Sequence, residues 1–215
     1  MENFHKKLDD LQEEIVNMAS FALKMLDDGV ISLKDQDQHL ADDVYERRLR
    51  LLEYDNMIEH KTLKILTLYQ PMATDMRIIA CILKSITYLY RIGRYGKDIA
   101  KITFELKDKP HFKKLVSIAA MAKIVIEMVN DSVKAFKEKD IGYIENLSDK
   151  DDEVDELNHS IFREVLSYMM EDSHKITQGA YYIMASRFLE RCGDMACKFG
   201  EKIQYMVTGE YKEIK

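Results

Sequence analysis

The chain has 215 residues, 47% of them hydrophobic, and its 32 basic and 38 acidic side chains give a formal net charge of −6. That is enough apolar material to bury a core without cross-links, and three cysteines with no CxxC pair favour a reducing cytosol over a disulfide-bonded protein. The sequence has no dense run of Lys and Arg to follow a nucleic-acid backbone, no apolar run of the about 20 residues that a membrane span needs, and an N-terminus unlike a signal peptide.

The sequence predicts an all-α protein with six helices. Apolar residues recur at steps of three and four, and only two prolines and eight glycines interrupt them. Gly29 is expected to close the first helix, and Gln70 to end the second because the residue before a proline resists helical dihedrals. In chain order, the predicted helices cover residues 3–28, 35–69, 72–107, 111–139, 143–171 and 175–207.

The chain reads as one helical unit written twice. The run YRIGR at residues 90–94 recurs one hundred residues later as ERCGD at residues 190–194. Self-similarity at a long period indicates a repeated architecture, and short connections make consecutive helices antiparallel. We therefore expect an elongated molecule of two tandem antiparallel three-helix bundles, formed by residues 1–108 and 109–215.

The second copy carries acids that the first copy lacks. Glu190 and Asp194 are four residues apart on one predicted helix, and Asp151 and Asp155 are four apart on the preceding one, so each pair shares a helix face. Gly193 removes the side chain that would hold the neighbouring helix away. Carboxylates brought together in this way repel one another unless a cation lies among them. These four acids therefore predict a metal site, whose oxygen ligands suit iron, manganese, magnesium or calcium better than zinc.

The same acids also have a simpler interpretation. A pair of acids at this spacing is usually a solvated helix face. Their place beside apolar seams and a close-packing glycine instead indicates a partly buried edge, where an unpaired charge is expensive. His174, near a predicted turn, is a weaker metal candidate because a lone histidine there is usually a capping or surface group. The sequence contains no phosphate-binding glycine loop, GxSxG elbow or HExxH motif, and therefore no evident catalytic nucleophile.

Several short segments, taken in their order and spacing, resemble one protein family over nearly the whole chain. They are LYQP (68–71), TDMR (74–77), RIG (91–93), DDEVD (151–155), SYMMED (167–172), LERCGD (189–194) and VTGE (207–210). The family is that of the PhoU proteins, which are regulators of phosphate uptake. The resemblance implies a fold of two three-helix bundles related by a pseudo-twofold axis.

The resemblance also implies a metal site. PhoU proteins bind iron or zinc clusters through an E(D)xxxD motif on two helices of each bundle. In the second half of this chain the motif falls on Asp151, Asp155, Glu190 and Asp194. In the first half the corresponding positions are expected to be Arg48, Leu52, Tyr90 and Arg94, none of which is an acid. We therefore expect at most one metal site, in the second bundle.

The partners implied by the resemblance are the ATPase of a phosphate ABC transporter and a membrane sensor kinase, both damped by a cytoplasmic regulator that is not an enzyme. Long exposed helices and 13 methionines make a homodimer plausible. Two alternatives stay open. One is a metal-free helical adaptor for another transporter. The other is a di-metal carboxylate enzyme, which would normally need Glu-x-x-His pairs that the facing helices lack.

Overall fold

The structure is a computed structural model that describes residues 2–107 and 109–214. Within these ranges every regular element is a helix, which confirms the predicted all-α class. The elements are α1 (Glu2–Asp35), α2 (Gln38–Glu46), α3 (Arg48–Tyr69), α4 (Thr74–Glu105), α5 (Val116–Glu138), the short 3₁₀ helix η1 (Ile141–Ile144), α6 (Leu147–Glu171), the 3₁₀ helix η2 (Ser173–Lys175) and α7 (Ile176–Thr208).

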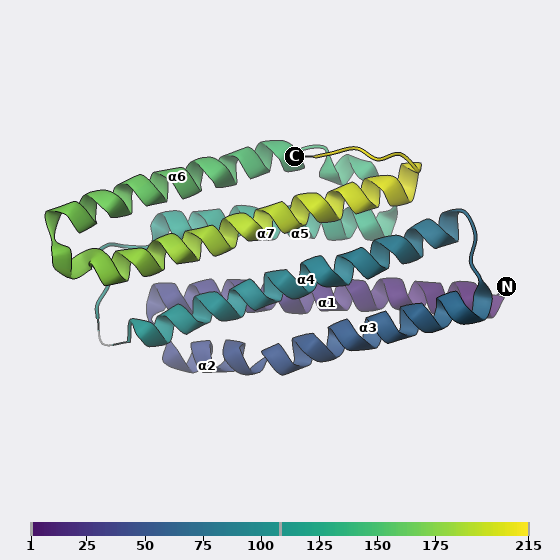
Figure 1. The fold of residues 1–215 in the computed structure, drawn as a ribbon, viewed down its shortest axis with the longest axis horizontal. Coiled ribbons are helices and arrows are strands. Elements are labelled where there is room, and N and C mark those ends of the chain that lie inside the picture. Colours follow the sequence, from purple (N-terminus) through teal and green to yellow (C-terminus); the bar gives the residue numbers. More distant parts are fainter. Residues whose placement is uncertain (1, 108, 215) are drawn as a thin grey trace.

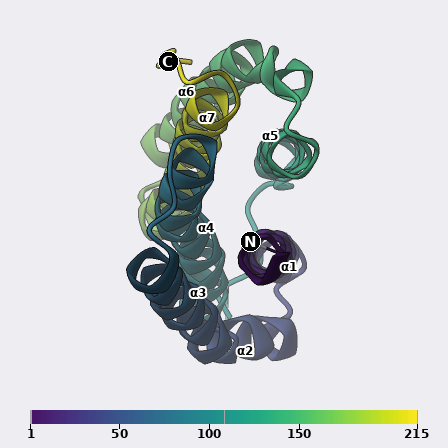
Figure 2. The same ribbon diagram turned by 90° about the vertical axis from the view of Figure 1, so that its right-hand side faces the viewer.

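The helices form two tandem three-helix bundles, as predicted, in an elongated molecule (Figure 1). The first contains α1, α4 and the α2 and α3 pair, and the second contains α5, α6 and α7. The bundles lie side by side, with α4 against α7 and α1 against α5. In the end view, α6, α7, α4 and α3 form one curved layer, and α5 and α1 lie on one side of it (Figure 2). The predicted boundary falls at residue 108, which lies outside the described residues, and it stays a prediction.

The first helix continues past Gly29, contrary to the prediction, and ends at Asp35. Gly29 is a packing residue and not a helix terminator. A Cβ atom built on it would lie 2.4 Å from the carbonyl oxygen of Gly96 on α4. Two glycines that face each other in this way let the α1 and α4 backbones approach closely.

The second predicted helix is interrupted, so the expected single helix over residues 35–69 is wrong. Gln36 adopts a left-handed conformation with φ 53°, and the side chain of Asp37 then caps α2 by accepting a hydrogen bond from the amide of Leu40 at 3.0 Å. Arg47 separates α2 from α3, and its guanidinium donates to Asp28 on α1 and to Asp43 on α2. These ion pairs fix the bend against the first helix.

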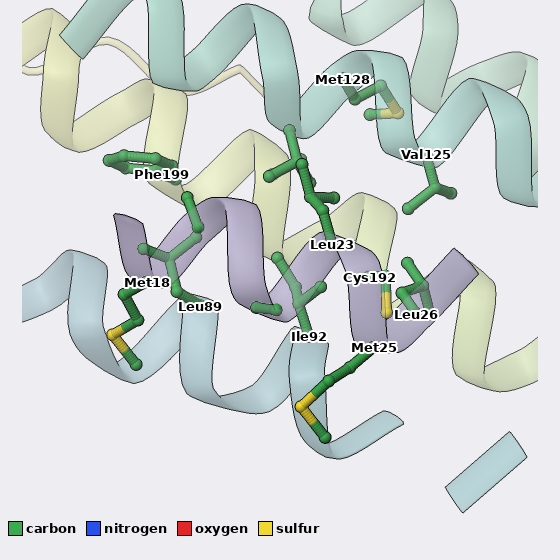
Figure 3. Packing of buried hydrophobic residues seen from close by; sticks show 14 of the residues in the cluster. Met18, Leu23, Met25, Leu26, Leu89, Ile92, Val125, Met128, Cys192 and Phe199 are labelled. Carbon is green, nitrogen blue, oxygen red and sulfur yellow. The ribbon is translucent and has the colours of Figure 1, made fainter. Parts of the chain in front are cut away.

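The buried apolar side chains form one core cluster that extends through both bundles. Figure 3 shows part of it. Its labelled residues come from α1, α4, α5 and α7: Met18, Leu23, Met25, Leu26, Leu89, Ile92, Val125, Met128, Cys192 and Phe199. All three cysteines are buried and none forms a disulfide, and burial raises the pKa of the Cys81 thiol to about 12. Among the described residues, no helix combines the length and the apolar character needed to cross a bilayer.

Candidate metal centre

The predicted acids lie where α6 and α7 pack closely, and Gly193 is the residue that permits this approach. A Cβ atom on Gly193 would lie 3.0 Å from Oδ1 of Asp151 and 3.5 Å from Cγ1 of Val154. Asp151 is only 3% exposed and Glu190 only 9% exposed. The predicted partly buried edge is therefore present, and the two acids nearest the helix interface are largely removed from water.

Glu190 has the most perturbed environment of the four acids. Its Oε1 accepts a hydrogen bond from the guanidinium of Arg187, whereas its Oε2 is buried and has no hydrogen-bond partner. Burial raises the pKa of Glu190, and the neighbouring charges of Asp194 and Asp155 raise it further, although Arg187 and Arg191 act in the opposite direction. Carboxylates of α6 and α7 thus interact electrostatically across the helix interface, as an acid-lined cation site requires.

The four acids do not form a finished coordination shell. Among the described residues, no three His, Cys, Asp or Glu side chains lie close enough together to hold a metal ion. Asp155 is half-buried and Asp194 is exposed. The all-carboxylate donors and the orphaned Oε2 atom of Glu190 fit a cation in their chemistry. The metal site at Asp151, Asp155, Glu190 and Asp194 stays a prediction.

The expected first-half counterparts of Asp151 and Asp155 are wrong by three residues along α3. A Cβ atom on Gly93 would meet Leu51 at 2.6 Å, just as Gly193 meets Asp151, so the repeat keeps its spacing of one hundred residues. The burial pattern of residues 91–100 is likewise identical, position by position, to that of 191–200. Asp151 therefore corresponds to Leu51 and Asp155 to Asp55, in place of Arg48 and Leu52.

Of the four first-bundle positions that correspond to the predicted ligands, one thus carries an acid, Asp55, and sequence reasoning missed it. Asp55 is half-buried, and burial together with the charge of Glu59 raises its pKa. The spacing of one hundred residues, already visible in the RIG and RCG runs, was the signal that would have identified it. The position one turn before Asp55 is occupied by Leu51, which is apolar and fully buried. Asp55 therefore has no acidic partner at that position.

The α4 positions of the first bundle are basic and aromatic, as expected from the sequence. The guanidinium of Arg94 lies 5.9 Å from the ring centre of Tyr90, and its interaction with Tyr90 raises the pKa of Arg94. A guanidinium at the position that corresponds to Asp194 repels a cation. The first bundle therefore lacks the ligand set for a metal site of this kind.

The raised pKa of Glu190 predicts how pH affects stability in the metal-free protein. When folding raises the pKa of a carboxyl, its protonation stabilises the folded state. This contribution to the free energy of unfolding is fully present below the ordinary pKa of 4.5 and is lost as the pH rises through the folded-state pKa. We expect Glu190→Gln to raise the thermal midpoint at pH 7.5 by about 2–4 °C, equivalent to about 1 kcal/mol for a chain of this size.

Thermal unfolding in the presence of a chelator, from pH 7.5 down to pH 4.5, checks this expectation. The difference between Glu190→Gln and the wild type should close as the pH falls and Glu190 takes up its proton. Glu153→Gln, an exposed substitution on α6, should have the same thermal midpoint as the wild type at every pH. A difference that does not change with pH would contradict the electrostatic account of Glu190.

Comparison with known proteins supplies the remaining observation. The PhoU domain family model matches residues 6–103 and 118–203, once in each bundle. A phosphate-specific transport system accessory protein PhoU homolog of Aquifex aeolicus is 35% identical over 207 residues, which are 95% of this chain and 93% of the relative. One of Clostridium acetobutylicum is 30% identical, covering 98% of this chain and 97% of the relative. The crystal structure of PhoU from Pseudomonas aeruginosa has a TM-score of 0.92 at 30% identity and covers 96% of this chain and 100% of that chain. The chain therefore belongs to the PhoU family.

Proposed function

We propose that this protein is a cytoplasmic accessory regulator of phosphate-specific transport and not an enzyme. The observation that carries the proposal is the match to accessory proteins of that system along almost the whole of both chains, at 35% identity to the relative from Aquifex aeolicus. Both helical units are matched by the family model, so the two-bundle body is shared and not only one half of it.

The regulator acts through its helix surfaces. Phe162, Leu166 and Met170 are all exposed and follow one another at steps of four residues on α6, so they form an apolar stripe on one face of that helix. Such a stripe suits a protein partner better than water does. We assign it to contact with the ATPase of the phosphate ABC transporter or with the membrane sensor kinase, both of which the regulator damps.

The proposal includes a bound metal ion with a structural role, and iron or zinc is the expected element. Asp151 and Asp155 from α6 would hold it together with Glu190 and Asp194 from α7. When bound, the ion supplies the positive charge that offsets the repulsion among these carboxylates. These carboxylates would then hold α6 and α7 together near the N-terminal end of α6, the helix that carries the exposed stripe.

A complementation experiment tests the regulatory role. The chain is expressed in a bacterium that lacks its own PhoU and carries a phosphate-starvation reporter. At high phosphate we expect the reporter to fall severalfold relative to the empty vector, because the regulator again damps the kinase. The double variant Phe162→Glu and Leu166→Glu should lose the repression, since the charges disrupt the apolar stripe on α6.

Affinity capture from the same cells provides the second measurement. Recovery of the transporter ATPase or the sensor kinase with the wild type, and its loss with the stripe variant, is the expected result. A reporter that stays high while the protein accumulates in folded form, with neither partner recovered, would contradict the proposal.

A metal-free helical adaptor is the second candidate. It is favoured by one observation, the lack of three closely spaced ligand side chains among the described residues. This adaptor would use the same apolar stripe on α6, but its α6 and α7 acids would hold no metal. The metal content of the purified protein therefore separates the two candidates.

A further inference from the structure

A hollow of about 710 Å³ lies where the two bundles join. It is bounded by the end of α1, the segment that connects the bundles, and the start of α5. The lining residues are Lys34, Asp35, His111, Phe112, Lys113, Lys114, Leu115, Val116 and Ala119. It is distant in sequence from the acids of the candidate metal centre, and the proposed function makes no use of it.

The wall of this hollow is held in place by hydrogen bonds from both bundles. The His111 ring lies 2.8 Å from the carbonyl oxygen of Leu33 through Nε2 and 2.6 Å from the hydroxyl oxygen of Tyr182 through Nδ1. Because a carbonyl only accepts, Nε2 carries the proton and Nδ1 accepts from Tyr182. Gln178 on α7 donates to the carbonyl of Pro110 at 3.1 Å. Pro110 and His111 are therefore held in place by contacts to both bundles.

The side chains that line the hollow carry a net positive charge, opposite in sign to the net charge of the whole chain. Three lysines and one aspartate line it, whereas the whole protein carries a net charge of −6. Lys113 is paired with Glu164 on α6, and Lys34 lies 3.5 Å from Asp35 in an exposed pair. Lys114 has no ion-pair partner among the described residues. Lys34 of α1 and Lys114 of the connecting segment are both exposed and both line the hollow.

The remaining lining is apolar. Phe112, Leu115, Val116 and Ala119 contribute it, and Val116 is 67% exposed at the start of α5. An isolated inorganic ion would leave this apolar wall and most of the volume in water. A hollow of this size that combines an apolar wall with charged and polar side chains is suited to a small organic ligand that carries a charge.

We propose that this hollow binds a small phosphorylated metabolite with a flat apolar body, of the nucleoside monophosphate class. A phosphate monoester carries a charge of about −1.5 to −2 at pH 7, which two ammonium groups match. Lys34 and Lys114 bind the phosphate, and the body of the ligand packs against Phe112 and Val116. The ligand would contact α1 of the first bundle and α5 of the second together, so its binding would stabilise the junction of the two bundles. The site does not depend on the metal or on the proposed transport partners.

Calorimetric titration at low salt tests the site with three probes: adenosine 5′-monophosphate, adenosine and inorganic phosphate. We expect the monophosphate to bind at least about tenfold more tightly than either fragment, since each fragment gives up one set of contacts worth about 1.4 kcal/mol or more. Lys34→Gln and Lys114→Gln should each weaken binding of the monophosphate by about tenfold. Lys84→Gln, an exposed substitution on α4, is the matched control and should change nothing.

Each other outcome overturns the inference. Adenosine that binds as tightly as its monophosphate would show that the lysines recognise no phosphate. Equal weakening by Lys84→Gln would show a non-specific effect of charge. No heat with any probe at millimolar concentration, from protein whose thermal midpoint matches the wild type, would show that the hollow is not a ligand site. Metal content measured on the same samples should be unchanged, so this test fails or succeeds apart from the candidate metal centre.

Discussion

Replacing Gly96 by alanine is expected to lower the free energy of unfolding by about 3 kcal/mol. A Cβ atom on Gly96 would lie 2.5 Å from the carbonyl oxygen of Met25 and 2.6 Å from the amide nitrogen of Leu26. Both atoms belong to the α1 backbone and cannot rotate away. The added methyl group would therefore push α1 from α4 along the interface where Gly29 and Gly96 meet.

Urea unfolding followed by circular dichroism measures this effect. Alanine is intrinsically better than glycine inside a helix by about 1 kcal/mol, so a net loss of stability would show that the steric clash outweighs helix propensity. Gly142→Ala is the matched control, because its Cβ atom meets only the side chain of Asp140, at 3.2 Å. Equal costs for the two substitutions would contradict the close backbone packing of α1 and α4.

Removing two carboxylates from α7 is expected to abolish metal binding. Protein purified without chelators should carry iron or zinc, and the double variant Glu190→Gln and Asp194→Asn should lose it. The reason is that two of the four predicted oxygen ligands disappear while the helix packing at Gly193 is kept. Elemental analysis of matched preparations gives the metal content per chain directly.

Two control variants make this experiment specific. Asp55→Asn should leave the metal content unchanged, because Leu51 and Arg94 stand where a site in the first bundle would need acids. Glu153→Gln, an exposed substitution on α6, should also have no effect. Metal retained by the α7 double variant would exclude the proposed ligands, and metal lost with Asp55→Asn would place an ion in the wrong bundle.

The repeated units and the close approach at the acid pair could be predicted from the sequence because both depend on local spacing. The helical period gave the bundles, and the small side chain at Gly193 indicated the contact with α6. The break at Arg47 could not be predicted in this way. It depends on an ion pair with Asp28, nineteen residues away on another helix.

Two other features could not be predicted from the sequence, for a related physical reason. A glycine that ends a helix and a glycine that packs against another helix look alike in one dimension, and only the contact of Gly29 with Gly96 distinguishes them. The hollow beside His111 is built from α1, the connecting segment and α5, with a hydrogen bond from Tyr182 on α7. No spacing rule brings such distant residues together.

Anomalous X-ray scattering from crystals of the metal-loaded protein, recorded at the absorption edge of the element found by elemental analysis, tests the central claim most directly. The account predicts density for the metal between α6 and α7, within bonding distance of Glu190 and Asp194, and none beside Asp55. A peak elsewhere, or no peak between α6 and α7 in crystals that contain the metal, would contradict it.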